Sequence, residues 1–410
     1  MKSLFPSAPG FWAYWQSLVS SSAAYQMLTV AIGWQVYAVS GSVMNLGLVG
    51  LAQFAPQLLL TLIVGDAADR FDRRRIAMVC QALMCAGAAW LSLVSFLGWP
   101  SLTAVFSCAV LFGAARAFEM PVVQAMLPGL VEAPDLPRSL SLSASARQAA
   151  MIAGPALGGA LYLPGAFVAY GACALLFALA LLRMVKTPTV KLVAKREPFS
   201  IKTLFGGIAY AKSQPVILGA LSLDLFAVLL GGATALLPVY ARDILHTGPA
   251  GLGVLRAAPS VGALLMSLVL ARYPLKNRVG RKMFASVAVF GAGTVVFGLS
   301  ESFALSLAAL FTLGASDMIS VVIRHTLVQI DTPDAMRGRL SAVNAVFIGT
   351  SNQLGEFESG LTAAWFGTVP AVVLGGVGTL VVVALWMRLF PSLRGRDQLV
   401  AAGPATTQSE

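Results

Sequence analysis

The sequence contains few of the residues that build most enzyme sites. It has only two histidines, and its four cysteines lie inside apolar segments without the spacing of a metal or redox site. It contains no Gly-x-x-x-x-Gly-Lys-Ser/Thr loop for nucleotide phosphates, and no pairing of a nucleophile with a base. The sequence therefore argues against an enzyme and against ATP as its energy source. It predicts no cofactor and no metal site.

Charge is also scarce. Only 11% of the 410 residues are charged and 58% are hydrophobic, whereas about a quarter of the residues in soluble proteins are charged. The apolar runs are too numerous and too long for a buried core, and many reach the ~20 residues that cross a bilayer. We therefore expect an all-α polytopic membrane protein. The net charge of +11 does not indicate nucleic acid, because the basic residues lie between the apolar runs, where anionic lipid is the expected partner.

Twelve apolar segments predict twelve transmembrane helices. They lie near 12–38, 44–64, 76–98, 101–122, 139–163, 166–184, 215–241, 252–272, 283–300, 303–324, 340–365 and 369–390. A basic stretch divides them into two groups of six, and 201–214 within it is typical of an amphipathic helix on the membrane surface. The expected domains are an N-terminal half (1–185), a cytoplasmic linker (186–213), a C-terminal half (214–391) and a disordered tail (392–410).

The distribution of Lys and Arg predicts the orientation. If the loops alternate sides, nearly all basic loop residues fall on one side, and the opposite side holds only Arg242. Basic loops stay in the cytoplasm. We therefore expect both termini and the linker in the cytoplasm, in a multi-pass protein of the inner (cytoplasmic) membrane. We also expect a monomer.

The most densely charged stretch, Gly65–Arg75, is predicted to be a short cytoplasmic loop between two apolar helices. Part of it, Asp69–Arg74, recurs in altered form as Asn277–Lys282, which indicates two related halves in tandem. The arginines alone satisfy the rule for cytoplasmic loops. The carboxylates, Asp69 above all, suggest a charge latch that ties helices together in the outward-open state.

These residues resemble the major facilitator superfamily. Its signature loop is similar to Gly65-x-x-x-Asp69-Arg70-x-x-Arg73-Arg74, although Asp72 replaces a glycine, and these five residues are the expected cytoplasmic gate. Ala150-x-x-x-Gly154-Pro155-x-x-Gly158-Gly159 resembles the helix-5 motif of proton-driven antiporters. Gly47–Phe54 and Gly355–Gly360 resemble the branch of enterobactin and macrolide exporters. The resemblance implies a major facilitator fold of two pseudo-symmetric six-helix halves, working by alternating access.

Charges inside the predicted helices are candidate functional residues, because a charge at mid-depth costs about 2.5 kcal/mol or more. Asp224 and Glu356 are the first candidates for proton coupling, followed by Asp317, because burial favours the neutral form of a carboxyl group and lets it carry a proton. Each carboxylate has alternatives: a structural pair with an arginine or hydroxyl, or a cation site. Arg116 is either a ligand for an anionic substrate or the partner of Glu119, three residues on.

Polar side chains spaced four apart form stripes on three predicted helices, and they either line the substrate cavity or bond neighbouring helices. The stripes pair Ser22 with Gln26, Gln53 with Gln57, and Asn352 with Glu356. Arg116, Gln26, Gln53, Gln57 and Asn352 are the candidate cavity residues. Arg324 and His325, at the end of their helix, are expected to extend to the membrane interface.

The sequence thus predicts a secondary active transporter that exports a small amphipathic molecule, such as a drug or a siderophore-like metabolite, by proton antiport. Its expected partners are that substrate, protons and the lipid bilayer, with no nucleic acid. Three alternatives remain open: an uptake symporter, a flippase for a lysophospholipid-like lipid, and a membrane sensor that does not transport.

Overall fold

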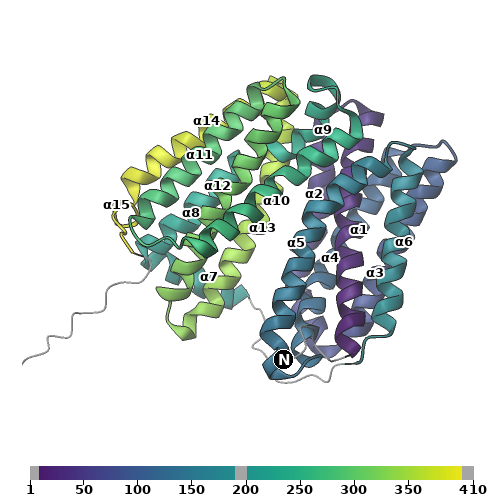
Figure 1. Ribbon diagram of the computed structural model, residues 1–410, viewed down its shortest axis with the longest axis horizontal. Coiled ribbons are helices and arrows are strands. Elements are labelled where there is room, and N and C mark those ends of the chain that lie inside the picture. The colour runs from purple at the N-terminus through teal and green to yellow at the C-terminus, as the bar shows by residue number, and fades with distance from the viewer. Residues whose placement is uncertain (1–8, 190–200, 399–410) are drawn as a thin grey trace, which may run out of the picture. The chain divides into compact units, whose positions relative to one another are not determined.

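The computed structural model describes residues 9–189 and 201–398, and every element of regular structure in these ranges is helical (Figure 1). The chain forms two compact units. The first contains Met1–Phe199 and Thr234–Ser260, and the second contains Ser200–Ala233 and Val261–Glu410. The units do not follow the expected halves along the chain, because Thr234–Ser260 packs with the helices that precede the linker.

Six long helices build most of the first unit. They are α1 (Pro9–Ser40), α2 (Val43–Arg70), α3 (Arg73–Phe96), α4 (Leu102–Met126), α5 (Leu136–Leu161) and α6 (Ala166–Val185), with the short turns η1 (Leu127–Gly129) and η2 (Ala133–Asp135) between α4 and α5. Helix α1 packs against α2, α4, α5 and α6, so a polar residue on α1 reaches partners on several helices. Phe112, Tyr170 and Phe177 are fully buried in the core of this unit.

The second unit contains most of the remaining helices. They are α7 (Ile201–Ser213), α8 (Pro215–Leu230), α11 (Val279–Leu299), α12 (Phe303–Ile330), α13 (Asp334–Phe366), α14 (Thr368–Leu389) and α15 (Pro391–Arg394). Helix α10 (Gly248–Arg272) begins in the first unit and ends in the second. The helix expected at 201–214 is present as α7, and it packs on α13. Leu223, Phe284 and Ile323 belong to the core of this unit.

The charged stretch between the second and third spans is not the loop that the sequence predicted. Helix α2 continues through Gly65 to Arg70, and α3 begins at Arg73, so only Phe71 and Asp72 interrupt the helices. The 28 residues of α2 reach about 42 Å, longer than the hydrocarbon thickness, so its charged last turns can remain helical outside the lipid. Asp72 caps α3 by accepting a hydrogen bond of 2.9 Å from the Arg74 amide.

The predicted helix at 215–241 is broken rather than continuous. Helix α8 ends at Leu230, and after Gly231 and Gly232 the chain continues as η3 (Ala233–Leu236), α9 (Leu237–Val239) and the wider turn η4 (Tyr240–Ile244). A Cβ on Gly232 would lie 2.4 Å from the Gly355 carbonyl oxygen on α13. The pair of glycines thus ends the helix and admits the backbone of α13.

Each of the twelve predicted spans corresponds to helical chain. Within the described ranges, nine helical segments are long and apolar enough to cross a membrane by length and composition. The other three, α1, α5 and α13, are 32, 26 and 33 residues long and carry more polar side chains. Among these are Ser21, Arg147 and Glu356. The protein is therefore an all-α, multi-pass membrane protein whose less apolar helices hold several of the candidate residues.

Candidate functional site

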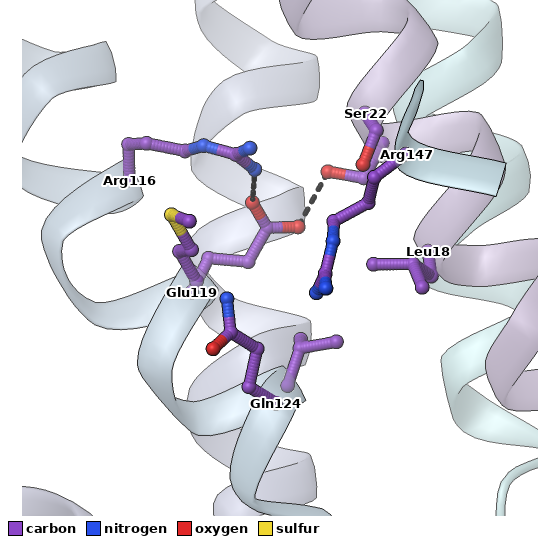
Figure 2. A pocket seen from close by; sticks show the side chains of 9 residues that line it. Leu18, Ser22, Arg116, Glu119, Gln124 and Arg147 are labelled. Atoms are coloured by element: carbon purple, nitrogen blue, oxygen red, sulfur yellow. Dashed lines mark hydrogen bonds and ion pairs between the residues drawn. The ribbon is translucent and has the colours of Figure 1, made fainter. Parts of the chain in front are cut away.

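A small pocket lies between α1, α4 and α5 in the first unit (Figure 2). It is lined by Leu18, Ser21, Ser22, Arg116, Glu119, Met120, Val123, Gln124 and Arg147. Two arginines and one glutamate face a space whose other lining residues are neutral. The pocket therefore has one formal positive charge more than it has negative charges.

Glu119 is the centre of a buried polar network that joins three helices. Its side chain is almost completely buried, and its Oε2 accepts a hydrogen bond of 2.8 Å from Arg116 Nη1. Its Oε1 accepts hydrogen bonds from the Ser21 hydroxyl on α1 and, at 3.2 Å, from Gln81 Nε2 on α3. Gln81 also donates to the Ser17 hydroxyl at 3.0 Å. Both carboxylate oxygens are thus engaged, which stabilises the negative charge of Glu119.

The predicted pairing of Arg116 with Glu119 is confirmed. The Arg116 guanidinium also lies over the ring of Tyr25, with 4.7 Å from its Cζ to the ring centroid. An ion pair on one side and an aromatic face on the other hold the side chain in place. The prediction that Arg116 also contacts a substrate is not tested by this contact.

Arg147 enters the same pocket from α5. Figure 2 shows its side chain pointing into the pocket, on the side of Glu119 away from Arg116. Among the side chains that the structure describes, no carboxylate forms an ion pair with Arg147 and no side chain hydrogen-bonds it. Arg147 falls within the helix predicted near 139–163, but the sequence did not assign it to a site.

A second buried ion pair lies in the other unit, between Asp224 on α8 and Arg324 on α12. Asp224 is 5% exposed and Arg324 is 2% exposed. The expectation that Arg324 extends to the membrane interface is therefore wrong, because the guanidinium is held inside by a carboxylate from a distant part of the chain. His325, the next residue, is exposed. Asp224 thus has the arginine partner that the sequence analysis gave as the alternative to proton coupling. The proton-coupling role of Asp224 stays a prediction.

Asp317 differs from Asp224 because no side chain that the structure describes forms an ion pair with it. It is half-buried on α12, and among the described residues it has no hydrogen-bond or ion-pair partner. Glu356 is half-buried on α13, next to Gly355, where α8 and α13 approach closely. Asn352, one turn earlier, is exposed and donates a hydrogen bond of 2.8 Å to the Ile348 carbonyl of its own helix.

The three predicted glutamines of the first unit are all half-buried. Gln26 packs against Gly154, whose added Cβ would lie 2.6 Å from the Cβ of Gln26. The Gln53 backbone packs against Gly113 of α4, where an added Cβ would lie 1.9 Å from the Gln53 carbonyl oxygen. Gln26 and Gln53 thus lie at helix contacts, and their role in a cavity, like that of Gln57, stays a prediction.

The helix-5 motif forms close backbone contacts, as expected for its small residues. A Cβ on Gly158 would lie 2.7 Å from the Met27 carbonyl oxygen of α1, and one on Gly159 would lie 2.2 Å from that of Pro249. Gly253 of α10 in turn faces the Pro155 carbonyl oxygen. The motif therefore packs α5 against α1 and the first turns of α10, two contacts that a larger side chain would disrupt.

The arginines of the expected gate bind helix ends within the first unit. Arg73 Nη1 donates to the Ala125 carbonyl oxygen of α4 at 3.1 Å, and Arg74 Nη2 donates to that of Val185 at the end of α6. The last carbonyls of a helix lack internal partners, so these contacts satisfy them. Arg70 is exposed. For Gly65 and Asp69 the structure describes only the helical backbone, so the proposed latch stays untested.

Comparison with known proteins identifies the family. The family model described as "Transmembrane secretion effector" matches residues 6–402, nearly the whole chain. The chain belongs to this family. Over 393 residues the transporter is 25% identical to a Citrobacter koseri protein named Enterobactin exporter EntS, covering 96% of this chain and 94% of that relative. The resemblance to major facilitator transporters, in the branch of the enterobactin exporter, is thus confirmed.

Solved structures confirm the fold of the transporter. The crystal structure of the nucleoside transporter NupG aligns with a TM-score of 0.70 at 12% identity, over 93% of this chain and 99% of that one. A bacterial homologue of the iron transporter ferroportin in an inward-facing state aligns with a TM-score of 0.72 at 16% identity, over 94% and 99%. At these identities the similarity concerns fold alone. The transporter is a multi-pass secondary transporter of the major facilitator type and not an enzyme.

Sequence reasoning missed the parts of the site that depend on contacts between helices. It proposed the local partner of Glu119 but not Ser21 or Gln81, which come from α1 and α3. It also missed the partner of Arg324. The available signal was the presence of both acidic and basic residues inside apolar helices, which shows that pairs are possible but not which residues pair.

Proposed function

We propose that this transporter exports a small amphipathic molecule in exchange for protons, by alternating access between its two halves. Export is supported by its relatives, because the protein that it matches over 96% of its length is named as an exporter of enterobactin. A siderophore-like or drug-like cargo fits this relationship and the predominantly apolar helices.

The observation that carries the proton step is the contrast between Asp317 and Asp224. Asp224 has Arg324 as a buried counter-ion, which stabilises the ionised carboxylate in the membrane. Asp317 is half-buried with no partner in the described residues, so its neutral, protonated form costs less than its charged form inside the helices. A carboxyl group that is protonated when enclosed and ionised when water reaches it can carry a proton. We therefore assign the proton to Asp317 and a structural role to Asp224.

Glu356 is the second carboxylate of this proposal. It lies on α13 beside the glycine contact with α8, so a change at that contact would alter its access to water. Glu358, two residues on, accepts a hydrogen bond of 2.7 Å from Thr362 on its own helix. Because residues two apart point in different directions on a helix, Glu358 is not a second member of the same site.

The test is proton movement in liposomes that contain the purified transporter, measured while candidate drugs and siderophores are added one at a time. Cargo should trigger proton release in the wild type, and Asp317→Asn should abolish it. Asp334→Asn is the matched control, because Asp334 is a carboxylate whose side chain is 88% exposed at the start of α13. Cargo movement without any proton signal would instead indicate uniport or lipid flipping and would contradict antiport.

A further inference from the structure

We propose that the pocket between α1, α4 and α5 binds an acidic group, such as a carboxylate or phosphate, and that Arg147 is the residue that holds it. The acidic group belongs either to the cargo or to the headgroup of a phospholipid, which offer the same oxygen anion. If the acidic group belongs to the cargo, the inference rests on the proposed function and adds that the exported molecule is negatively charged.

The first reason is that Glu119 has no capacity left for Arg147. One of its carboxylate oxygens accepts from Arg116 at 2.8 Å, and the other accepts from Ser21 and Gln81. The negative charge of Glu119 is therefore balanced by Arg116 alone. Arg147 remains as the uncompensated charge of the pocket.

The second reason is that the other residues around Arg147 are neutral. The remaining lining side chains are Leu18, Ser21, Ser22, Met120, Val123 and Gln124. The buried Tyr14 lies close enough to interact electrostatically with Arg147 but carries no formal charge. An arginine inside a membrane helix normally pairs with an anion, because an isolated charge there is costly. The one anion of the lining, Glu119, is already paired with Arg116, so a ligand is the remaining source.

The shape of the lining also indicates what adjoins the acidic group. A guanidinium offers planar, paired N–H donors that match the two oxygens of a carboxylate or phosphate, and Ser22 and Gln124 add further donors at the wall. The apolar residues of the lining are Leu18, Met120 and Val123. The residue types of the lining therefore favour an acid that also has an apolar part, and the pocket, which holds about 10 Å³ in this structure, would have to widen to admit it.

Binding of a matched acid and amide tests the cargo arm. The full-length transporter in phosphatidylcholine nanodiscs is titrated calorimetrically with naphthoate and with naphthamide, which differ only in charge at one end. The acid should bind more tightly than the amide. Arg147→Gln should weaken binding of the acid about tenfold to hundredfold, the loss of a charge-assisted hydrogen bond, and should leave the amide unchanged. Arg147→Lys should retain part of the preference.

Arg256→Gln is the control variant, because Arg256 is also a half-buried arginine of the first unit, on α10, but does not line the pocket. It should bind the acid as the wild type does. The size-exclusion profile and melting temperature show whether each variant is folded. If Arg147→Gln does not fold, binding of the acid and the amide to Arg147→Lys still tests the proposal.

Retained lipid tests the headgroup arm. The transporter is purified from membranes that contain phosphatidylglycerol, and bound lipid is counted by native mass spectrometry. Anionic lipid that is retained by the wild type, displaced by naphthoate and lost in Arg147→Gln would assign the site to a headgroup. Equal binding of acid and amide would overturn the proposal, as would acid binding and lipid retention that both survive Arg147→Gln. Absence of binding in both arms would also overturn it.

The two proposals fail separately. If acid binding at Arg147 is absent while cargo still releases protons through Asp317, only the anion site is wrong. If the acid binds and no cargo releases protons, antiport is wrong and the anion site stands.

Discussion

The ion pair between Asp224 and Arg324 gives the sharpest prediction about stability, because both side chains are buried and come from different helices. Asp224→Val and Arg324→Met each remove one charge and leave an apolar side chain of broadly comparable size. Either single substitution leaves the other charge enclosed without its counter-ion. We therefore expect each to lower the free energy of unfolding by about 3–5 kcal/mol.

The double variant should recover most of that loss. Once both charges are gone, neither desolvation penalty remains, and an apolar replacement of a buried pair is neutral or stabilising by about 1–4 kcal/mol. The two single effects should thus be far from additive, with a coupling free energy of at least about 3 kcal/mol. Unfolding of the purified protein in mixed micelles, followed by circular dichroism during titration with a denaturing detergent, measures all four variants.

A matched control is the ion pair of Asp334 with Arg337, which has an N–O distance of 2.7 Å but side chains 88% and 40% exposed. Substitutions there should change the free energy of unfolding by less than about 1 kcal/mol, since water screens the pair. If the losses of Asp224→Val and Arg324→Met simply add in the double variant, the buried pair does not hold α8 to α12 and our reasoning is wrong.

Three further substitutions have distinct expected outcomes. Glu119→Gln removes the charge that balances Arg116 and should cost about 3 kcal/mol of unfolding free energy, while an unchanged melting temperature would mean that the network does not stabilise the unit. Gly159→Ala places a Cβ 2.2 Å from the Pro249 carbonyl oxygen and should reduce thermal stability and transport, whereas Gly338→Ala, with nothing within 4 Å, should leave both unchanged. Asp69→Asn should impair transport at a wild-type level of membrane insertion, and full activity in that variant would refute the charge latch.

The fold class follows from the sequence because it depends on the length of apolar runs, which is a local property. The ends and breaks of the helices were harder to predict from the sequence. Gly65–Arg70 is rich in charge and was predicted as loop, but α2 extends through it because a helix can continue beyond the lipid. The break after Leu230 depends on Gly231 and Gly232 meeting the α13 backbone, and no pattern within one segment shows which helix will approach it.

The site was predictable only where partners are close in sequence. Arg116 and Glu119 are three residues apart on one helix, and their pairing was foreseen. Asp224 was recognised as an intramembrane charge, but Arg324 was assigned to the interface. Its partner lies on α8, and helical periodicity does not specify which helices become neighbours. The same limit hid the contacts of Glu119 with Ser21 and Gln81.

Among the side chains that the structure describes, each unit holds a buried ion pair and also a half-buried charged group outside that pair, and we propose that these two groups have separate tasks. In the first unit Glu119 balances Arg116, and the positive charge of Arg147 is left for an acidic ligand. In the second unit Arg324 balances Asp224, and the carboxyl group of Asp317 is left for a proton. The two ion pairs stabilise contacts within or between helices, whereas Arg147 and Asp317 form no ion pair among the side chains that the structure describes. Because paired charges are held by their partners, we expect exchange of cargo and protons to depend on Arg147 and Asp317, with Glu356 as the second carboxylate.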